Sequence, residues 1–343
     1  MLESPKKETA VVILNYNGKH WLEKFLGNVI EHSSKDADVI VADNASTDDS
    51  LEFLANNFPS IQVIVLKENF GFAGGYNESL KEIDYKYFVL LNSDVEVSEN
   101  WLKAPIERLK EKEVGAVQPK LLMYDNKETY EYAGAAGGYI DRLGYAFCRG
   151  RIVKDLEKDN GQYNESVKIF WASGAAMFVK SEVFWKAGGF DSTFFAHYEE
   201  IDLCWRIKNL GYDIYFEPNS KVFHVGGGTL SNDSPRKTFL NHRNSLAMLY
   251  KNLPKKKRFK VIFTRLVLDG MIACHSLLKL RYKHFWAVAQ AHFSFYGMLS
   301  DLKTKQLNVS DTPSEIYDCN IIADYILSKK RKFSELRLHK IKS

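Results

Sequence analysis

Four short apolar runs alternate with amphipathic stretches in the first 92 residues, and this alternation limits the possible folds more than any other feature. The runs predict strands at residues 11–14, 38–42, 61–66 and 87–91. Between the first two, apolar residues recur at helical spacing: Trp21, Leu22, Phe25, Leu26, Val29 and Ile30. Repeated strand–helix units of this length predict a parallel sheet with helices on both faces.

Each expected strand is followed by polar or acidic side chains. Ligands of open α/β sheets bind outside the carboxyl ends of the strands. Four strands that carry polar residues at the same edge therefore predict a binding site. The residues are Asn15, Tyr16, Asn17, Asp43, Asn44, Asn69, Asn92, Ser93 and Asp94, with the Ser46 or Thr47 hydroxyl as the expected cap of the helix that follows Asp43.

Asp94 follows the apolar run 88–91 and has Asn92 two residues before it. A carboxylate at an open strand end is a natural ligand for a hard divalent ion that also holds phosphate oxygens. By itself, an Asx-turn that merely ends the strand is the more frequent explanation.

The glycine-rich stretch 69–76 is expected as a loop that leads into a helix. It has neither the dinucleotide spacing G-x-G-x-x-G nor the P-loop ending G-K-[ST]. Gly74 and Gly75 permit close backbone approach to a ligand, although a plain tight turn would explain them as well.

Acidic residues crowd the start of a helix expected at 199–210, which Gly211 closes. The helix dipole favours negative charge there and accounts for one or two of Glu199, Glu200 and Asp202. Three acids are more than capping requires, and their repulsion would raise at least one pKa, as a general base needs. Arg206 stands four residues after Asp202 and can pair with it on one helix face.

His224 lies between an expected strand and a glycine-rich stretch. A lone histidine in such a place is more often a core residue satisfied by backbone groups. The alternative is a metal ligand or a phosphate contact.

The cysteines and the amino-terminal residues predict a cytosolic protein. The four cysteines, Cys148, Cys204, Cys274 and Cys319, form no C-x-x-C pair, which argues against a zinc cluster or a disulfide framework. The first ten residues are not followed by a signal-peptide apolar core, and we expect no uninterrupted apolar run long enough to span a bilayer.

Charge is distributed unevenly along the chain. Residues 1–250 hold 28 Lys and Arg against 36 Asp and Glu, whereas residues 251–343 hold 19 against 7. The basic part is also aromatic and has apolar residues at helical spacing between residues 255 and 299. Such helices can lie in a membrane interface, or they can simply pack on the catalytic domain. We expect an anionic membrane surface as a partner and no nucleic acid.

Taken in order, seven segments resemble the inverting glycosyltransferases of family 2, which have the GT-A fold for nucleotide sugars. They are VVILNYNG, VADNASTDDS, NFGFAGGYNESL, LLNSDVEV, SGAAMFV, GGFDSTFFAHYEEIDLCWRIKNLGY and HVGGGT, and together they cover roughly residues 10 to 230. Within the family, these motifs are most similar to those of bacterial rhamnosyltransferases and related cell-envelope enzymes.

The resemblance implies a mixed α/β GT-A sheet, a Mg²⁺ or Mn²⁺ cofactor and specific residue roles. Tyr16 would stack on a pyrimidine, Asp43 would bind the base or ribose, and Asn69 with Gly74 and Gly75 would border the nucleotide. Asn15, Asn17, Asn44, Asn92 and Ser93 would complete the donor site. Asp94 and His224 would hold the metal, Glu200 would be the catalytic base with Glu199 and Asp191 as alternatives, and Trp171, His197 and Arg206 would face the acceptor.

Two departures from the family pattern weaken these assignments. Asn92 replaces the first Asp of the D-x-D motif, so the metal has one carboxylate fewer. The base motif is Glu199-Glu200 where Glu-Asp is usual.

These features predict a GT-A catalytic domain at 1–232, with nucleotide-sugar binding at 8–115 and the acceptor part at 116–232. A basic helical region would follow at 233–343. The expected reaction moves a sugar from dTDP-rhamnose or a UDP-hexose to a saccharide, lipid-linked, at the cytoplasmic face of the inner membrane. The rival readings are a nucleotidyltransferase, which would need a basic loop where residues 15–18 stand, and a non-catalytic glycan- or sugar-nucleotide-binding protein.

Overall fold

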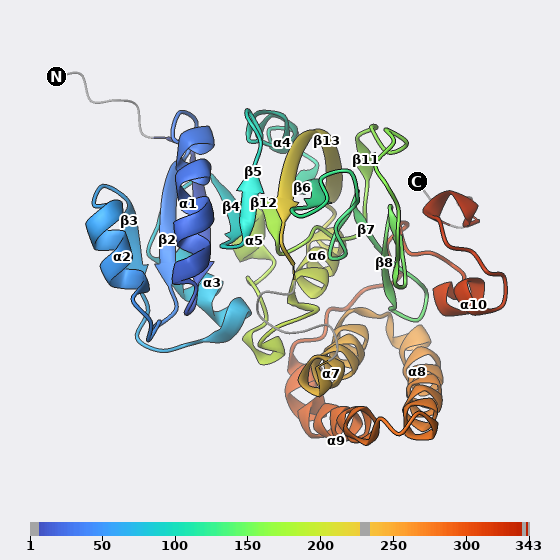
Figure 1. Ribbon diagram of the computed structural model, residues 1–343. Helices are drawn as coiled ribbons and strands as arrows, with labels where there is room; N and C mark the ends of the chain where they lie inside the picture. Colours follow the sequence, from blue (N-terminus) through green and yellow to red (C-terminus); the bar gives the residue numbers. More distant parts are fainter. Residues whose placement is uncertain (1–6, 227–233, 338–340, 342–343) are drawn as a thin grey trace.

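A single mixed sheet forms the centre of the molecule (Figure 1). The computed structural model describes residues 7–226, 234–337 and 341. The sheet has nine strands in the order β11-β13-β6-β12-β4-β1-β2-β3, with β5 paired to β13. Its strands are β1 (Thr9–Asn15), β2 (Asp38–Asp43), β3 (Gln62–Val65), β4 (Tyr87–Asn92), β5 (Val95–Val97), β6 (Val114–Met123), β11 (Val167–Lys168), β12 (Ala176–Lys180) and β13 (Asp213–His224).

The four predicted strands are present and parallel, so this part of the prediction is confirmed. β12 runs antiparallel between β4 and β6, which makes the sheet mixed. Helices cover both faces, as the alternation of β1 requires. Ala10 and Val12 pack in the core that includes α3, α5 and α6, whereas Val11 and Ile13 pack with residues of α1 and α2. These helices, with α4, are α1 (Lys19–Ser33), α2 (Ser50–Asn57), α3 (Gly71–Lys81), α4 (Lys103–Leu109), α5 (Ser181–Lys186) and α6 (Glu199–Asn209).

Two local predictions in the amino-terminal half are wrong. The expected loop 69–76 is already helical from Gly71, because the small residues let α3 pack against the sheet. A Cβ at Gly75 would lie 2.9 Å from Leu14 Cδ1. The second error is the cap of α2: the helix begins at Ser50 after Asp49, and the Ser46 hydroxyl instead accepts from Asn17 N at 2.9 Å.

The segment 124–161, which follows β6, contributes a small second sheet in the order β10-β9-β8-β7. Its strands are β7 (Gly138–Ile140), β8 (Ala146–Cys148), β9 (Arg151–Ile152) and β10 (Asp155–Leu156), and a 3₁₀ turn, η1 (Ser192–Phe194), precedes α6.

The carboxy-terminal part is largely helical, as predicted, and packs against α6. α7 (Pro235–Asn252) contacts α6; in Figure 1, α8 (Lys255–Leu278) stands to the right of α7 and α9 (Tyr282–Thr304) lies below it. The chain then returns to the small sheet, where Ile321 N donates to Asp141 Oδ2 at 3.0 Å, and ends with α10 (Ile321–Ile326) and η2 (Phe333–Glu335). The boundary predicted at residues 232 and 233 lies outside the described residues.

Candidate active site

Three of the predicted residues meet at one edge of the sheet because their strands share a register. Asn15 pairs with Asp43 across β1 and β2, and Leu14 pairs with Asn92 across β1 and β4. The ends of β1, β2 and β4 are therefore level. This is the edge at which open α/β sheets bind ligands.

Hydrogen bonds knit the turns after β1 and β2 into one surface. Asn15 Nδ2 donates to Asp43 Oδ2 at 3.0 Å, and Ser46 N donates to Asp43 Oδ1 at 2.8 Å. Asn17 Oδ1 accepts from Thr47 N at 2.7 Å. Asp43 is fully buried and already accepts two hydrogen bonds, whereas the Tyr16 ring is 46% exposed at the rim of this surface. The ring is thus available for stacking.

Asn44 connects this surface to the start of α3. Its amide donates to Asn69 Oδ1 and to Gly71 O, both at 3.0 Å, and its carbonyl oxygen accepts from Phe70 N at 3.0 Å. Gly74 and Gly75 lie inside α3, where a Cβ would meet Phe70 or Leu14 at under 3 Å. The structure therefore explains both glycines by packing of the helix rather than by open space for a ligand.

Asp94 and His224 come together although they are 130 residues apart in the chain. β5 follows Asp94 directly and pairs with the end of β13, with His224 opposite Val95. His224 Nε2 lies 3.2 Å from Asp94 Oδ1 and 3.4 Å from Asn92 Nδ2. The predicted metal ligands thus face each other, with Asn92 beside them.

Glu131 is the third member of this cluster, and nothing in the sequence pattern pointed to it. Its Oε1 lies 3.3 Å from His224 Nδ1, on the far side of the ring. Burial alone would lower the pKa of His224, but the charge of Glu131 and the hydrogen bond and charge of Asp94 outweigh it and raise the pKa to about 10. An environment that holds a proton this strongly also favours a cation.

The donor set of this cluster fits a divalent ion that completes its coordination with ligand oxygens. Asp94 supplies carboxylate oxygen and His224 supplies imidazole nitrogen, a pair suited to Mn²⁺. Metal-bound histidines commonly give their other nitrogen to a carboxylate, which is the position that Glu131 occupies. Among the described residues, no group of three or more His, Cys, Asp and Glu side chains could hold a metal by itself. Any ion would therefore need oxygens from the ligand.

The segment 173–175 brings Glu200 to the same edge. Asn92 N donates to Ala175 O at 3.0 Å, so this segment lies directly beside the end of β4. A Cβ at Gly174 would lie 3.0 Å from Phe72 Cζ and 3.9 Å from Glu200 Cβ. A glycine lets Phe72 of α3 approach this segment closely, and Glu200 of α6 lies at its other side. The start of α6 and the polar end of β4 thus both adjoin the segment 173–175.

Glu199 and Glu200 each have a carboxylate oxygen that is buried and has no hydrogen-bond partner. Burial raises the pKa of Glu200 to about 7, and burial and the charge of Glu200 raise the pKa of Glu199. The prediction of a raised acid pKa at this helix start agrees with these shifts. Glu200 is half-buried and Glu199 is buried, so Glu200 is the more accessible of the two.

Asp191, the other candidate base, is held by cations. Lys251 Nζ lies 2.6 Å from its Oδ2, and Lys305 Nζ lies 3.1 Å from its Oδ1. Although burial opposes it, the charge of Lys251 keeps the pKa of Asp191 far below its usual range. A carboxylate paired in this way is a poor proton acceptor near neutral pH.

Asp202 and Arg206 form the predicted pair, with Arg206 Nε 2.9 Å from Asp202 Oδ2. Asp202 also accepts from Lys251 and Asn252 at 2.9 and 2.8 Å. Arg206 is buried and donates to Ala187 O as well. These contacts give Arg206 a structural role and leave its predicted contact with the acceptor without support.

The loop before α6 has an unusual backbone. Phe195, His197 and Tyr198 have φ values of 63°, 67° and 73°, a region that non-glycine residues rarely adopt. Such conformations persist only where surrounding contacts hold them. The loop leads directly into Glu199 and Glu200, so its shape determines where these acids lie.

Asn244 of α7 provides those contacts, and the sequence did not reveal it. Its fully buried side-chain amide donates to Phe194 O, Ala196 O and His197 O at 3.0, 2.9 and 2.7 Å. The neighbouring Arg243 donates to Asn244 Oδ1 at 2.8 Å and orients the amide. A helix of the carboxy-terminal region therefore shapes the loop 194–198, which leads into Glu199 and Glu200.

The remaining acceptor candidates are less open than expected. The Trp171 indole is 3% exposed and donates to Tyr139 O at 3.0 Å, with its ring against Gly138. His197 is half-buried, its Nε2 has no hydrogen-bond partner, and burial and then Lys237 lower its pKa to about 4. His197 is thus a neutral imidazole near pH 7.

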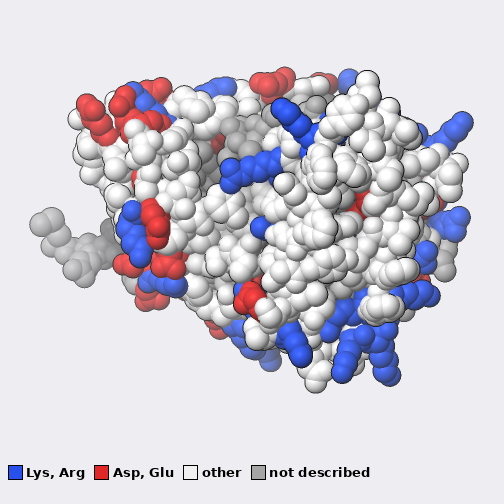
Figure 2. Space-filling view, turned by 90° about the horizontal axis from the view of Figure 1, so that it is seen from below, with Lys and Arg blue, Asp and Glu red and all other residues white. Residues whose placement is uncertain are grey.

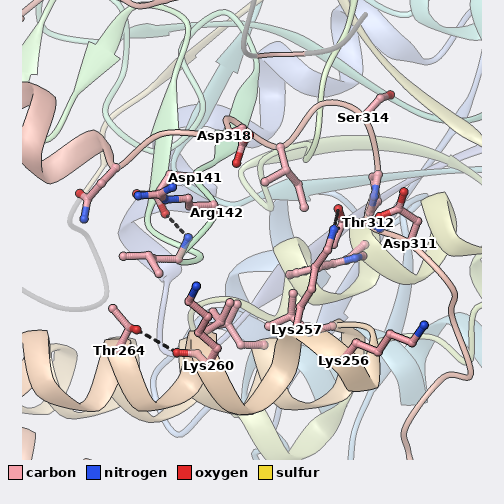
Figure 3. A pocket seen from close by; sticks show the side chains of 18 of the residues that line it. Asp141, Arg142, Lys256, Lys257, Lys260, Thr264, Asp311, Thr312, Ser314 and Asp318 are labelled. Carbon is pink, nitrogen blue, oxygen red and sulfur yellow. Dashed lines mark hydrogen bonds and ion pairs between the residues drawn. The ribbon is translucent and has the colours of Figure 1, made fainter.

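A cavity of about 690 Å³ lies away from Asp94, behind the amino-terminal half of α8 (Figure 3). Its floor includes buried Leu249, Leu253 and Trp205, and Lys256 and Lys260 stand at its rim. Trp205 belongs to α6, so this cavity adjoins the middle of that helix, whereas Glu199 and Glu200 of the candidate site stand at its amino-terminal end. None of the predicted site residues lines it.

The family model for glycosyl transferase family 2 matches residues 10–185, which is more than half of the chain. The chain belongs to this family. The matched part contains the ends of β1, β2 and β4 and the segment 173–175, whereas Glu200 and His224 lie beyond it. The rival reading of the chain as a nucleotidyltransferase is thereby set aside.

Curated relatives of this glycosyltransferase include two rhamnosyltransferases. The N-acetylglucosaminyl-diphospho-decaprenol L-rhamnosyltransferase of Mycobacterium tuberculosis is 22% identical over 256 residues, which cover 70% of this chain and 83% of the relative. Rhamnosyltransferase WbbL of Escherichia coli is 23% identical, with 62% and 82% of the two chains covered.

Solved structures show the same GT-A fold. GalNAc-T7 with UDP, GalNAc and Mn²⁺ has a TM-score of 0.56 at 16% identity, and the match covers 72% of this chain and 48% of that one. The mannosyltransferase PcManGT from Pyrobaculum calidifontis, in complex with GDP-Man and Mn²⁺, has a TM-score of 0.51 at 13% identity, with 85% and 88% covered. The predicted fold class is confirmed.

Proposed function

We propose that this family 2 glycosyltransferase moves a sugar, with inversion at the anomeric carbon, from a nucleoside diphosphate sugar to a hydroxyl group of a saccharide. The observation that carries this proposal is the segment 173–175, which joins the end of β4 to Glu200. Glu200, a carboxylate with a raised pKa, suits a base on one side of the sugar. Asp94 and His224, which suit a cation, would stand near the leaving diphosphate on the other side.

The donor would lie along the ends of β1, β2 and β4. The exposed Tyr16 ring is suited to stacking on a nucleobase, and Asp43 and Asn15 can receive the base or ribose through rearranged hydrogen bonds. The names of the two rhamnosyltransferase relatives support dTDP-rhamnose as donor, and a UDP-hexose is the alternative.

Glu200 would act as the base. Its carboxylate would remove the proton from the acceptor hydroxyl as that oxygen bonds to the anomeric carbon and the bond to the diphosphate oxygen breaks. A pKa of about 7 matches proton transfer near neutral pH. Removing such a base typically costs about 10²–10⁴-fold in rate.

Asp94 and His224 would hold a divalent ion, with Glu131 orienting the imidazole. When bound, Mn²⁺ or Mg²⁺ would offset the negative charge that develops on the leaving diphosphate. Asn92 offers no charge to the ion, so we expect weaker metal binding than with two carboxylates.

The acceptor in this proposal is a lipid-linked saccharide, reached at the cytoplasmic face of a membrane in cell-envelope glycan synthesis. The name of the mycobacterial relative, which specifies a diphospho-decaprenol acceptor, supports it. His197, a neutral imidazole beside the base, is the acceptor contact that we retain.

A donor screen tests the proposal. The full chain would be incubated with dTDP-rhamnose, UDP-hexoses and GDP-mannose, with and without Mn²⁺, and hydrolysis and transfer would be measured. We expect one donor to react, with Mn²⁺ required. Glu200→Gln should abolish transfer and keep donor binding near that of the wild type, whereas Glu78→Gln, on the exposed face of α3, should change neither. Equal loss of binding and turnover in Glu200→Gln would contradict the base role.

A further inference from the structure

The helix α8 buries two charged side chains and exposes large apolar ones, the reverse of a surface helix in an ordinary globular protein. Its buried side includes Arg265 and Asp269, which are 2% and 0% exposed and form an ion pair at 3.5 Å. Arg265 also donates to Leu143 O and to Ser245 Oγ. Arg265 and Asp269 of α8 are thus turned inward, and Arg265 is hydrogen-bonded to the catalytic domain and to α7.

The outward side of α8 is apolar. Phe259, Phe263, Val267 and Met271 are spaced four residues apart, so they form one stripe, and all are at least half exposed. On α9, Tyr282, Trp286 and Phe293 are exposed to a similar degree. Contiguous exposed apolar surface of this kind marks a contact with a membrane or another protein.

The charges around this face are almost all positive. Residues 255–304 contain ten Lys and Arg against two Asp, and one of the two is the buried Asp269. Lys255, Lys256 and Lys260 stand at one end of α8, and Lys279 and Lys283 stand at the turn into α9, all exposed. Figure 2, which views the molecule from below, shows a broad area with few charged side chains, with Lys and Arg along its lower right border and Asp and Glu mainly on the left. Acidic lipid headgroups complement such a border.

We propose that the α8–α9 hairpin lies in the plane of an anionic membrane interface, with the stripe Phe259, Phe263, Val267 and Met271 among the acyl chains. This inference deepens the membrane location in the proposed function and rests on it. The partner in this proposal is the membrane surface rather than one bound lipid. In this orientation, α7 and the loop 194–198 would lie on the membrane side of the molecule, from which a lipid-linked acceptor would come.

The structure favours a position in the plane over a span. α8 is long enough and apolar enough to cross a bilayer, contrary to our expectation from the sequence, since Arg265 and Asp269 are its only charges between Val261 and Leu278. A span would need both of these residues to leave their partners in the catalytic domain. Breaking a buried ion pair in this way is costly. One side of α8 is held by protein, so only the other can enter the membrane.

Flotation of the full chain with lipid vesicles tests whether the α8–α9 hairpin binds a membrane. Vesicles of equal parts phosphatidylcholine and phosphatidylglycerol should carry the chain upward, and vesicles of phosphatidylcholine alone should carry much less. Phe263→Ser should weaken binding at least about tenfold, because a large apolar side chain no longer leaves water. Val65→Ser is the matched control, since Val65 is 58% exposed on β3 and Phe263 is 59% exposed. Equal loss in both variants, or no binding of the wild type, would overturn the proposal.

Two further measurements define the geometry. Lys279→Gln together with Lys283→Gln should weaken binding to the anionic vesicles and leave binding to phosphatidylcholine unchanged. Brominated lipids should quench tryptophan fluorescence of the wild type, and Trp286→Phe should remove that quenching while Trp185→Phe keeps it. Alkaline carbonate should release the bound chain. Resistance to carbonate would indicate a span and contradict the in-plane position.

Other outcomes are distinguishable from these. A dimer in solution that Phe263→Ser dissociates, with no vesicle binding, would assign the face to a second copy of the chain and overturn the proposal. Donor hydrolysis with Mn²⁺ is measured in parallel and should be unchanged in Phe263→Ser. If the wild type binds vesicles and hydrolyses no donor, the proposed function fails, but membrane binding by the α8–α9 hairpin is still supported.

Discussion

The ends of β1 and β2, which we propose as the donor edge, and the loop 194–198, the catalytic loop of our proposal, are held in place in different ways. At the donor edge, Asn15, Asp43 and Ser46 bond to one another, and β1 and β2 are neighbours in both sequence and sheet. The loop 194–198 is held by Asn244, about 50 residues further along the chain. The proposed donor edge is therefore self-supporting, whereas the position of Glu200, the proposed base, depends on a helix outside the sheet.

This difference has a consequence for the carboxy-terminal region. α7 carries Asn244, Lys251 and Asn252, and these side chains contact the loop, Asp191 and Asp202. The basic helical region that we expected after residue 232 thus packs on the catalytic part and contacts the loop that leads to Glu200. A chain cut before α7 should keep the donor edge and lose the shape of the loop, which makes the contrast between the two testable by substitution.

Asn244→Ala should have the largest effect on this comparison. It leaves Ala196 O and His197 O of a strained loop without their donor, whereas Phe194 O keeps Arg243, so Glu200 should shift. Displacement of a catalytic group by about 1 Å can cost about 10²-fold in rate. We expect kcat to fall by this order with a KM for the donor near that of the wild type. Steady-state kinetics would measure both.

Asn241→Ala is the matched control, one turn earlier on α7, where the side chain makes no hydrogen bond in the described part of the chain. Thermal unfolding of both variants shows whether Asn244→Ala remains folded, since loss of a buried donor costs about 1–3 kcal/mol. A rise in donor KM with an unchanged kcat would show that the loop and the donor edge are not separately held.

Glu131→Gln should affect the metal rather than the base. Loss of a group that orients a ligating histidine typically costs about 10–100-fold in metal affinity. We expect the Mn²⁺ concentration for half-maximal activity to rise by this factor, with kcat at saturating Mn²⁺ little changed. Glu128→Gln, three residues earlier, serves as control. Identical Mn²⁺ titrations for Glu131→Gln and the wild type would remove Glu131 and His224 from the metal site.

The pH dependence follows from the raised pKa of Glu200. Burial raises it to about 7, and the base must be ionised to accept a proton, so activity should fall about tenfold per pH unit below that value. Stability has the opposite sign: the folded chain holds this proton to higher pH than the unfolded chain, so stability should fall between about pH 4.5 and pH 7, with the full loss present above about pH 7.

Glu200→Gln should therefore melt at a higher temperature than the wild type above about pH 7, with the difference shrinking toward about pH 5. Thermal unfolding at several pH values measures it. A difference that grows as the pH falls would mean that Glu200 is ion-paired in the folded protein, which would exclude it as the base.

The donor edge could be predicted from the sequence because strand ends in a parallel sheet lie level. Asn15, Asp43 and Asn92 were placed correctly by counting apolar runs. The packing of Gly74 and Gly75 could not be predicted, because a glycine that lets α3 pack against β1 has the same sequence signal as one that makes room for a ligand. Their contact with the nucleotide stays a prediction.

The catalytic loop could be predicted only in part. The cluster of acids marked Glu200, but Glu131 and Asn244 gave no signal, since one stands in an irregular segment and the other inside a helix whose packing partner is far away in sequence. Asp191 and Arg206 looked functional by their position next to the acids. The structure pairs Asp191 with Lys251, a contact that no spacing rule reveals, and Arg206 with Asp202, the pair that the spacing of four residues predicted.

Asn15→Ala should have the smallest effect and tests whether the donor edge supports itself. The substitution removes one of the two hydrogen bonds to Asp43, and Ser46 N still donates the other, so the edge should loosen rather than collapse. A hydrogen bond to a charged group contributes about 1.5–3 kcal/mol at most, and part of this is regained if water reaches Asp43. We expect a rise of about fivefold in donor KM and an unchanged kcat and pH profile, measured by initial rates. If kcat fell instead, the donor edge would also position Glu200, through Asn92 and Ala175, and the two regions would have to be treated as one.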